Sequence, residues 1–473
     1  MWVRRRTRSS VTRVGSLGLV CGWLGTNAWG MSALMPQTSA TAPAARTPSG
    51  LREAHCHIGA FGAALSLPSV SECASLGECL ARVTALCAVA KPGQHVRALH
   101  ARPLAWPEGR WPTLAELDAA AGAAPVVIMS FDHHQGVCNS AMLAAAGLSA
   151  GQRVGPKGEV VSDAHGVATG LLMEHAAYAA WEASPAPSVE ESLSHLRAGL
   201  RRYLELGFIE VHDLRTDLRL AEALVAMDLS GELAGELGMR VELFPLVQDL
   251  GPIVELVQTL RPARVRVAGG KLFADGTLNA RTALTLTPYA EALPGLPMGQ
   301  AMVTPSQVDE ALRACDALGL PLAVHAIGDG AVRMILDALA RVRPVAMGQR
   351  IEHCELIDPA DVPRFAELGV TASVQPCHLL TDVPALTRLL PQSLGRVLPV
   401  RSLIASGLTP GALVRGVVFG SDAPIVRPEP IDSIVGATRG GATGSASAVA
   451  GLDRLSPGEA IDEATAWRCF EPG

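Results

Sequence analysis

The stretch RIEHCELIDPADVPRFAELGVTASVQ, residues 350–375, holds a complete succession of strand, helix and strand. Residues 350–353 and 370–375 are short runs of the kind that form buried strands. Between them, the Asp-Pro pair at 358–359 opens the run 359–368, and proline is a common first residue of a helix. Two strands joined through a helix form a parallel pair. This stretch therefore predicts a parallel sheet covered by helices.

The same alternation extends outward from this stretch over most of the chain. Strands are expected at 51–57, 208–213, 241–247, 265–271, 320–325, 350–353, 370–375 and 417–422, and helices at 189–206, 304–318, 330–340 and 359–368. Eight strands with intervening helices predict an α/β fold, a (β/α)8 TIM-like barrel. A large insertion follows the first strand. Residues 60–200 are expected to form a lid subdomain over the catalytic face that carries specificity.

Both ends of the sequence differ in composition from this middle region. Residues 1–50 hold six arginines and no acidic residue, then a run rich in Pro, Ser, Thr and Ala. They fit a leader that is signal-like or disordered, or a start site assigned too far upstream. Residues 51–438 are expected to form the barrel with its lid, and 439–473 a linker (GGATGSASAVAG, 440–451) and a closing helix at 455–470. We expect a cytoplasmic protein, or an exported one if residues 1–50 are a genuine signal segment.

The composition excludes several classes of function. The 473 residues are 49% hydrophobic and carry a net charge of −6, so a large core is available and no basic footprint for nucleic acid is present. No apolar run reaches the ~20 residues of a transmembrane helix. The ten cysteines form no CxxC pair, and no nucleotide fingerprint indicates an organic cofactor. The expected partner is a small molecule, with no nucleic acid and no stable membrane span; the sequence leaves homo-oligomer formation open.

Residues that can bind metals stand at the ends of the expected strands. They are His55, His57, Lys271, His325, His353 and Asp422. His55 and His57 are two residues apart, so their side chains share one face of a strand. A single histidine at such a position is more often a packed core residue than a ligand. Six ionisable groups in one barrel mouth would cost desolvation free energy unless they are paired or bind metal, so together they predict a metal site.

Lys271 needs a separate explanation. The chain has 39 Lys and Arg residues, of which only Lys91, Lys157 and Lys271 are lysines. A protonated amine beside four histidines and a metal would be repelled, whereas a lysine carboxylated by CO2 becomes an anionic bridging ligand. Arginine cannot undergo this reaction, because it does not lose its proton. The alternative is a lysine whose amine reaches past the strand end to solvent.

Five motifs carry a resemblance to a known family. They are SFDHHQGVCNSAML (130–143), KLFADGTLNARTA (271–283), VHAIGDGAV (324–332), RIEHCELIDPADVPRFAELGVTASVQPCH (350–378) and VVFGSDAPI (417–425). With the strand-end ligands, they resemble the amidohydrolase superfamily, in particular the metal-dependent subfamily that includes N-substituted formamide deformylase. The resemblance runs in order from His55 to about residue 467. Members usually also have a small β-sandwich domain, which we expect to be missing or reduced here.

The resemblance implies a divalent metal site and a hydrolytic activity. His55 and His57 would bind one metal, His325 and His353 a second, and carboxylated Lys271 would bridge them, with Zn2+ as the expected ion and one or two ions bound. Asp422 would coordinate the first metal and act as general base on a metal-activated water that cleaves an amide or N-formyl-like C–N bond, other than a peptide bond. Two alternatives stay open: an inactive ligand-binding barrel, and a hydrolase of an ester, lactone or phosphoester.

Further polar residues near these motifs are expected to contact substrate or to orient the metal ligands. They are His134, Asn139, Asp275, Arg281, Asp329, Gln375 and His378. For Asp275 and Asp329, turn or helix-capping chemistry is an equally good interpretation. His133 is expected at the surface, His212 in a packing or supporting role, and Cys56 in the core, because strand alternation points it away from its histidine neighbours.

Overall fold

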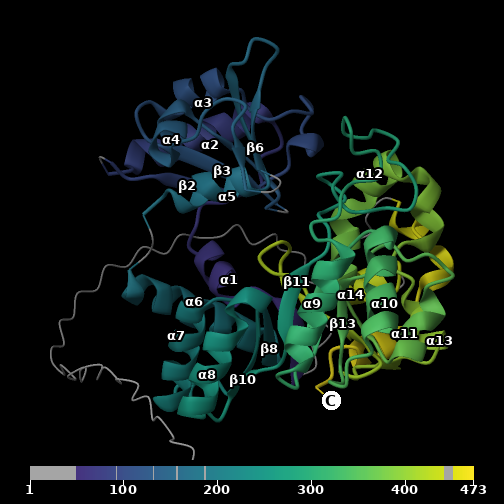
Figure 1. Ribbon diagram of the computed structural model, residues 1–473. Coiled ribbons are helices and arrows are strands. Elements are labelled where there is room, and N and C mark those ends of the chain that lie inside the picture. Colours follow the sequence, from purple (N-terminus) through teal and green to yellow (C-terminus); the bar gives the residue numbers. More distant parts are fainter. Residues whose placement is uncertain are drawn as a thin grey trace, which may run out of the picture. The chain divides into compact units, whose positions relative to one another are not determined.

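The computed structural model describes residues 50–91, 93–131, 133–155, 158–185, 188–440 and 451–472 (Figure 1). The expected leader falls, except for Gly50, outside the described residues, and so does most of the expected linker at 440–451. Residues Ala45–Gly473 form one compact unit. In the part of the chain that the structure describes, no helix has the length and apolar character needed to cross a membrane.

Two parallel sheets organise the chain. The first has the order β1 (Leu51–Cys56), β8 (Phe208–Thr216), β9 (Arg240–Pro245) and β10 (Val265–Val267). The second has the order β11 (Gly270–Phe273), β12 (Leu322–Ala326), β13 (Arg350–His353), β14 (Thr371–Val374), β16 (Gly416–Phe419) and β15 (Thr409–Pro410). Isolated parallel bridges, Cys56 with Ala423 and Leu246 with Lys271, join residues of the two sheets. The predicted α/β fold with parallel strands is therefore confirmed.

The expected strand at 265–271 is wrong in one respect, because it is two strands. β10 pairs with β9, whereas β11 pairs with β12. The chain crosses between them at Gly269, where a Cβ atom would lie 2.7 Å from the carbonyl oxygen of Pro321. Only glycine allows this approach, so the two halves of the expected strand belong to different sheets.

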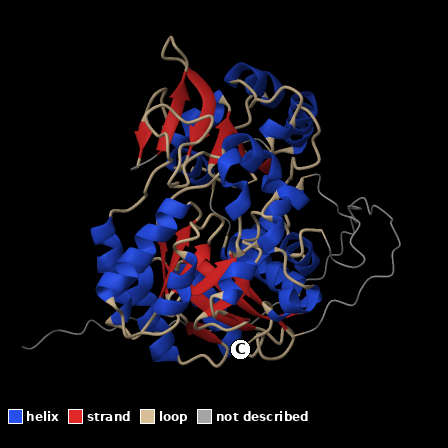
Figure 2. Cartoon of the chain, turned by 90° about the vertical axis from the view of Figure 1, so that its right-hand side faces the viewer, coloured by secondary structure: helices blue, strands red, loops and turns tan. Residues whose placement is uncertain are grey.

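Helices flank the parallel strands (Figure 2). They include α6 (Val189–Glu205), α7 (Leu218–Leu229), α8 (Leu250–Leu260), α9 (Pro305–Asp316), α10 (Asp329–Val342), α13 (Val400–Ala405) and α14 (Pro430–Ala437). Capping boxes open α6 at Ser188 and α9 at Thr304, as side-chain acceptors at helix starts predict. The helix expected at 359–368 is shorter, α11 (Val362–Leu368), because Asp358 accepts hydrogen bonds from the backbone of Ala360 and Asp361 and makes a turn first.

The segment between β1 and β8 contains a sheet of its own. Its order is β2 (Val96–Ala101), β3 (Val126–Ser130), β4 (Gln135–Cys138), β7 (Ala168–Met173), β6 (Gly158–Ser162) and β5 (Arg153–Val154). Alternation along β3 sends Val126 and Ile128 into one apolar cluster and Val127 and Met129 into another. The clusters are completed by helices α2 (Leu76–Val89), α3 (Leu114–Ala121), α4 (Ser140–Ala146) and α5 (His175–Glu182).

Two other helices between β1 and β8 belong with the parallel sheets. In α1 (Ile58–Ala64), Ile58 and Phe61 join the main core, and so do Leu200 and Tyr203 of α6. At the other end of the chain, the closing helix is shorter than the expected 455–470. It is α15 (Glu463–Arg468), capped by the side chain of Asp462.

Candidate metal centre at the strand ends

A cavity of about 360 Å³ opens beside the carboxyl ends of the parallel strands. Its wall includes seven of the residues that the sequence singles out: His55, His57, His134, His325, His353, His378 and Asp422. Carboxyl ends of parallel strands are where α/β folds place their ligands. The structure therefore brings together side chains that are far apart in the sequence, on the wall of one cavity.

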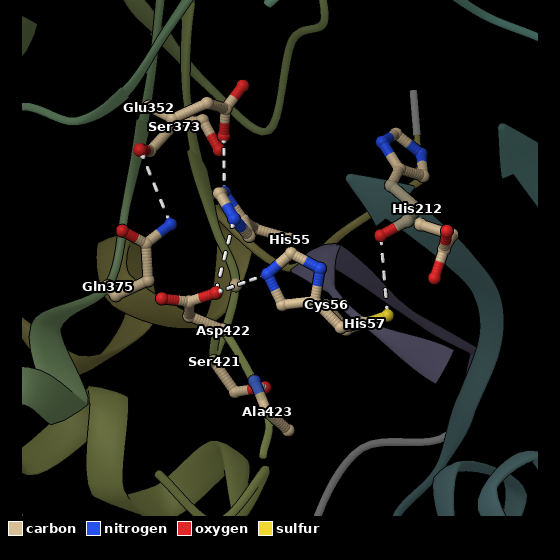
Figure 3. A network of polar contacts seen from close by, with 12 residues as sticks. His55, Cys56, His57, His212, Glu352, Ser373, Gln375, Ser421, Asp422 and Ala423 are labelled. Atoms are coloured by element: carbon tan, nitrogen blue, oxygen red, sulfur yellow. Dashed lines mark hydrogen bonds and ion pairs between the residues drawn. The ribbon is translucent and has the colours of Figure 1, made fainter. Parts of the chain in front are cut away.

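His55, His57 and Asp422 form the tightest group on this wall (Figure 3). One ligand atom of each lies within 4.8 Å of the others. The Oδ1 atom of Asp422 lies 3.3 Å from Nε2 of His55 and 3.0 Å from Nε2 of His57. Between the two histidines, Cys56 points the other way and its thiol donates to the carbonyl of His212. The expected core position of Cys56 is confirmed.

The backbone at Asp422 explains how its carboxylate reaches the histidines. Asp422 has a φ of 61°, in the left-handed region that non-glycine residues seldom adopt. Its backbone N–H donates to the carbonyl of His55 at 2.7 Å, which ties the end of β16 to β1. Burial opposes ionisation, but the charge and hydrogen bond of His55 and the hydrogen bond of His57 hold the pKa of Asp422 well below its ordinary value. The carboxylate is thus an anionic acceptor.

His325 and His353 extend the group from neighbouring strands. Their ring centroids lie 4.5 Å apart, and the ring of His353 lies 4.8 Å from that of His55. Burial holds the pKa of both well below the ordinary value, with Lys271 acting in the same direction on His325 and the neighbouring His325 on His353. A neutral imidazole keeps the lone pair that binds a metal. The Nδ1 atom of His353 is buried without a hydrogen-bond partner among the described residues.

Lys271 lies on β11, which pairs with β12, and is only 1% exposed. Its Nζ atom has no hydrogen-bond partner in the part of the chain that the structure describes, and lies 4.8 Å from the centre of the Phe273 ring. Burial lowers its pKa to about 8. An amine that reaches past the strand end to solvent is therefore ruled out. A buried amine without partners costs free energy, which fits a residue that needs a further group to complete its surroundings.

A carboxylate that the sequence did not single out orients the first of these ligands. Oε2 of Glu352 lies 2.7 Å from Nδ1 of His55, and Glu352 itself receives the guanidinium of Arg350 at 2.8 Å. A carboxylate that holds the second nitrogen of a ligating histidine fixes the ring orientation and raises its basicity. Arg350 and Glu352 alternate with Ile351 along β13, so strand periodicity was the available signal.

The loop before β4 contributes two histidines to the cavity wall. Nδ1 of His134 lies 2.8 Å from Oε2 of Glu174, and the other oxygen of Glu174 receives the hydroxyl of Thr282 at 3.3 Å. The prediction that His133 lies at the surface is wrong. His133 has a left-handed backbone with a φ of 60°, and its side chain lines the cavity. Burial lowers the pKa of His133 to about 3. The sequence carried no signal for Glu174 or for this turn.

The other predicted site residues lie outside the cavity lining. Asn139 caps α4 through Met142 and also bonds Val126 and Ala124. Asp275 accepts three backbone N–H groups, from Leu284, Ile327 and Gly328, and its Oδ1 is 3.5 Å from Nε2 of His325. Asp329 accepts the backbone N–H of Leu286 and pairs with Arg396. Arg281 donates to the carbonyl of Glu291. Gln375 donates to the carbonyl of Ser373. Each of these side chains has a contact that supports a loop or strand end.

A separate group on the same wall consists of Glu355, His378 and Asp382, whose ligand atoms lie within 4.8 Å of one another. Burial and the neighbouring Asp382 carboxylate raise the pKa of Glu355 well above its ordinary value. Of the three, only His378 was expected from the sequence. Glu355 lies within the motif at 350–378 but was not singled out there, and Asp382, in α12 (Leu379–Leu389), lies outside the five motifs.

The sequence of the chain is similar to those of known proteins. Residues 48–468 match the model of the Amidohydrolase family. The chain belongs to this family. An N-substituted formamide deformylase from Arthrobacter pascens is 26% identical over 377 residues, which cover 76% of this chain and 68% of the relative. Protein LONG AFTER FAR-RED 3 from Arabidopsis thaliana is 28% identical over 340 residues, covering 69% and 57%. The chain thus spans about three fifths to two thirds of the length of these relatives.

Two solved structures share the fold of this amidohydrolase-family chain. An uncharacterized metal-dependent hydrolase from Pyrococcus horikoshii OT3 superposes with a TM-score of 0.68 and 23% identity, covering 89% of this chain and 79% of the other. A second, from Pyrococcus furiosus, gives a TM-score of 0.65 and 24% identity. At this level of identity, the likeness concerns the fold.

The donor set of this family member fits a divalent metal. Imidazole nitrogens and a carboxylate oxygen are the ligands that zinc and similar ions take in catalytic sites. Three such atoms already lie within 4.8 Å of one another at His55, His57 and Asp422. Nδ1 of His353 and Nζ of Lys271 are among the buried polar atoms that lack a partner among the described residues, and metal binding would supply one.

Proposed function

We propose that this amidohydrolase-family chain is a metal-dependent hydrolase that cleaves a C–N bond in a small amide or N-formyl-like substrate, other than a peptide bond. The observation that carries the proposal is the convergence of His55, His57 and Asp422 on the wall of the cavity. Membership of the family supports it, and so does the likeness to N-substituted formamide deformylase.

The proposed ligands follow from the side chains at the strand ends. His55, His57 and Asp422 would hold one ion, and His325 and His353 a second. Lys271, carboxylated by CO2, would bridge them, with zinc as the expected metal. A bound metal of this kind lowers the pKa of water to near neutral and polarises a substrate carbonyl. The buried Nζ of Lys271 supports carboxylation, because a carbamate oxygen would give this amine the partner that it lacks.

The chain's own residues have distinct roles in the proposed reaction. Asp422 is held ionised and faces the cavity, so it can accept the proton of the attacking water and pass it to the leaving nitrogen. Glu352 keeps the His55 ring in place. His134 stands on the cavity wall with its ring fixed by Glu174, and we assign it to substrate contact together with His378.

The proposal also covers the architecture around the site. The bridges of Cys56 with Ala423 and of Leu246 with Lys271 support a closed (β/α)8 barrel in which β10 and β11 together make the fourth strand. The separate sheet between β1 and β8 would be the lid within residues 60–200, since its His133 and His134 line the cavity. A lid that brings polar groups to a barrel mouth is a usual way of setting specificity.

A substrate panel tests the activity. Metal-loaded protein is offered N-formyl amines, other small amides, esters, a lactone and a phosphotriester of similar size. Hydrolysis of the amides well above that of the others supports the proposal. Preference for an ester, lactone or phosphoester would contradict the C–N assignment. Ligand binding without turnover of any compound would favour an inactive ligand-binding barrel.

Native mass spectrometry tests the lysine assignment on the same sample. Carboxylated Lys271 adds the mass of one CO2 to the chain, and a Lys271→Arg variant serves as control because arginine cannot be carboxylated. An active, metal-loaded chain with unmodified Lys271 would contradict the assignment.

A further inference from the structure

A second group of side chains on the cavity wall combines His378, assigned above to substrate contact, with two carboxylates that have no role in the proposed reaction. Glu355 follows β13, His378 ends the short 3-10 helix η3 (Pro376–His378), and Asp382 lies in the first turn of α12. One nitrogen or oxygen atom from each lies within 4.8 Å of the others. Three elements therefore bring two carboxylates and an imidazole to one place in the cavity.

The three side chains offer polar atoms to a ligand there. Nε2 of His378 lies 3.2 Å from the carbonyl oxygen of Ser421. A carbonyl only accepts, so Nε2 donates this bond, and Nδ1 is the ring nitrogen left for another partner. The carboxylates of Glu355 and Asp382 accept hydrogen bonds, and Asp382 already receives one bond at 2.9 Å from the amide of Asn279.

Glu355 lacks the partner that a buried carboxylate requires. It is 4% exposed, and its Oε1 atom is buried without a hydrogen-bond partner in the part of the chain that the structure describes. No basic side chain among the described residues forms an ion pair with it, and Arg396 is paired with Asp329 and Asp358 instead. A buried carboxylate is costly when unpaired, and two adjacent carboxylates gain from a cation between them.

We propose that Glu355, Asp382 and His378 form a subsite for a protonated amine carried by the substrate. A primary ammonium has three N–H donors and no acceptor, which suits two converging carboxylates beside an imidazole ring. The ring centroids of His353 and His378 lie 6.1 Å apart, so the amine would be a few bonds from the bond cleaved at the strand-end site. The inference rests on the proposed function for the reaction, but binding of the amine does not require turnover.

A matched pair of substrates tests the subsite. N-formylethylenediamine and N-formylpropylamine have nearly the same shape, and an ammonium in the first replaces a methyl group in the second. We expect kcat/KM to be about tenfold or more higher for the charged compound, since charge-assisted hydrogen bonds are about twice as strong as neutral ones. Glu355→Gln and Asp382→Asn should each remove most of this preference, by lowering kcat/KM for the charged compound far more than for the neutral one. Glu291→Gln, an exposed carboxylate paired with Arg388, is the control for lost charge and should keep the preference.

The possible outcomes separate this inference from the proposed function. Equal kcat/KM on both compounds would overturn the subsite and leave the hydrolase proposal intact. If neither compound is hydrolysed, calorimetry with n-propylammonium and 1-propanol decides: tighter binding of the ammonium, lost in Glu355→Gln, supports the subsite, and equal or absent binding overturns it. Metal content should be the same in Glu355→Gln as in the parent chain. Loss of a metal ion in that variant would overturn the amine assignment, because these atoms would then be metal ligands.

Discussion

Two buried polar clusters share the strands β1 and β13 and differ in how their polar atoms are satisfied. In the Arg350 network, the guanidinium of Arg350 donates to Glu352, to Nδ1 of His212, to Ser373 and to the carbonyl of Ala54. In the strand-end cluster, Nζ of Lys271 and Nδ1 of His353 have no hydrogen-bond partner among the described residues. The first cluster is complete within the chain, whereas the second is not.

The difference separates structural from functional polar groups. Buried polar atoms are nearly always hydrogen-bonded, so each exception needs a reason. The Arg350 network stabilises the fold by satisfying its own members, and its removal should cost stability. In our proposal a bound metal completes the strand-end cluster, so its alteration should cost activity. Glu352 joins the two, because it receives Arg350 on both oxygens and holds His55 with one of them.

The largest effect is expected from Asp422→Asn in the strand-end cluster. The amide cannot take the proton from water, so kcat/KM should fall by about 1,000- to 10,000-fold, as for loss of a general base. The midpoint of thermal unfolding and the metal content should stay close to those of the parent chain. The steady-state rate on the preferred amide and a thermal melt check this. Full activity in the variant would remove Asp422 from the mechanism.

Arg350→Met tests whether the Arg350 network stabilises the fold. Removal of one partner of a buried ion pair leaves Glu352 uncompensated, so the free energy of unfolding should fall by about 3–5 kcal/mol. Arg388→Met, which breaks an exposed pair with Glu291, should cost only about 0–1 kcal/mol. Denaturant unfolding measures both. An equal, small loss in the two variants would mean that the Arg350 network does not stabilise the fold.

Most strand positions and several strand-end residues of the candidate site could be predicted from the sequence. The strands were placed closely because buried parallel strands are short apolar runs between helices, and β13 was predicted at the residues where it lies. His55 and His57 followed from alternation, and Asp422 from its position after β16. These signals are local, so one sequence suffices to find them.

The rest depends on contacts between distant segments. Glu174 and Glu355 are ordinary acidic residues until the fold places one beside His134 and the other beside His378 and Asp382. Asn139 shows the converse, since a conspicuous motif residue proves to cap a helix. The surface position expected for His133 was wrong, because two adjacent histidines in a sequence do not indicate a left-handed backbone.

Glu352→Gln tests the residue that the two clusters share. The amide is a weaker partner for Nδ1 of His55, so metal affinity should fall by about 10- to 100-fold, the usual cost of losing a residue that orients a metal ligand. Glu242→Gln is the matched control, because Glu242 is also buried but pairs with Arg266 rather than with a histidine of the site. Titration with a competing chelator gives both affinities. Unchanged metal affinity in Glu352→Gln would show that Glu352 does not support metal binding through His55.

The smallest effect concerns the pH dependence of stability in the Arg350 network. Burial lowers the pKa of His212 to about 4 from its ordinary 6.5, although its hydrogen bond with Glu210 acts in the opposite direction. Between these values the unfolded chain binds a proton that the folded chain does not, so the free energy of unfolding should decrease as pH falls from 6.5 to 4. In His212→Gln this decrease should be smaller. Identical slopes for the two chains would show that His212 is not held neutral.

The most direct test of the central claim is the metal content of the chain, measured by inductively coupled plasma mass spectrometry after purification without chelators. The incomplete strand-end cluster predicts one or two equivalents of zinc or a similar divalent ion per chain. A His55→Ala, His57→Ala double variant should lose at least one of them, and Arg388→Met should lose none. Absence of metal from the parent chain, even after reconstitution with zinc and bicarbonate, would contradict a metal centre at these strand ends.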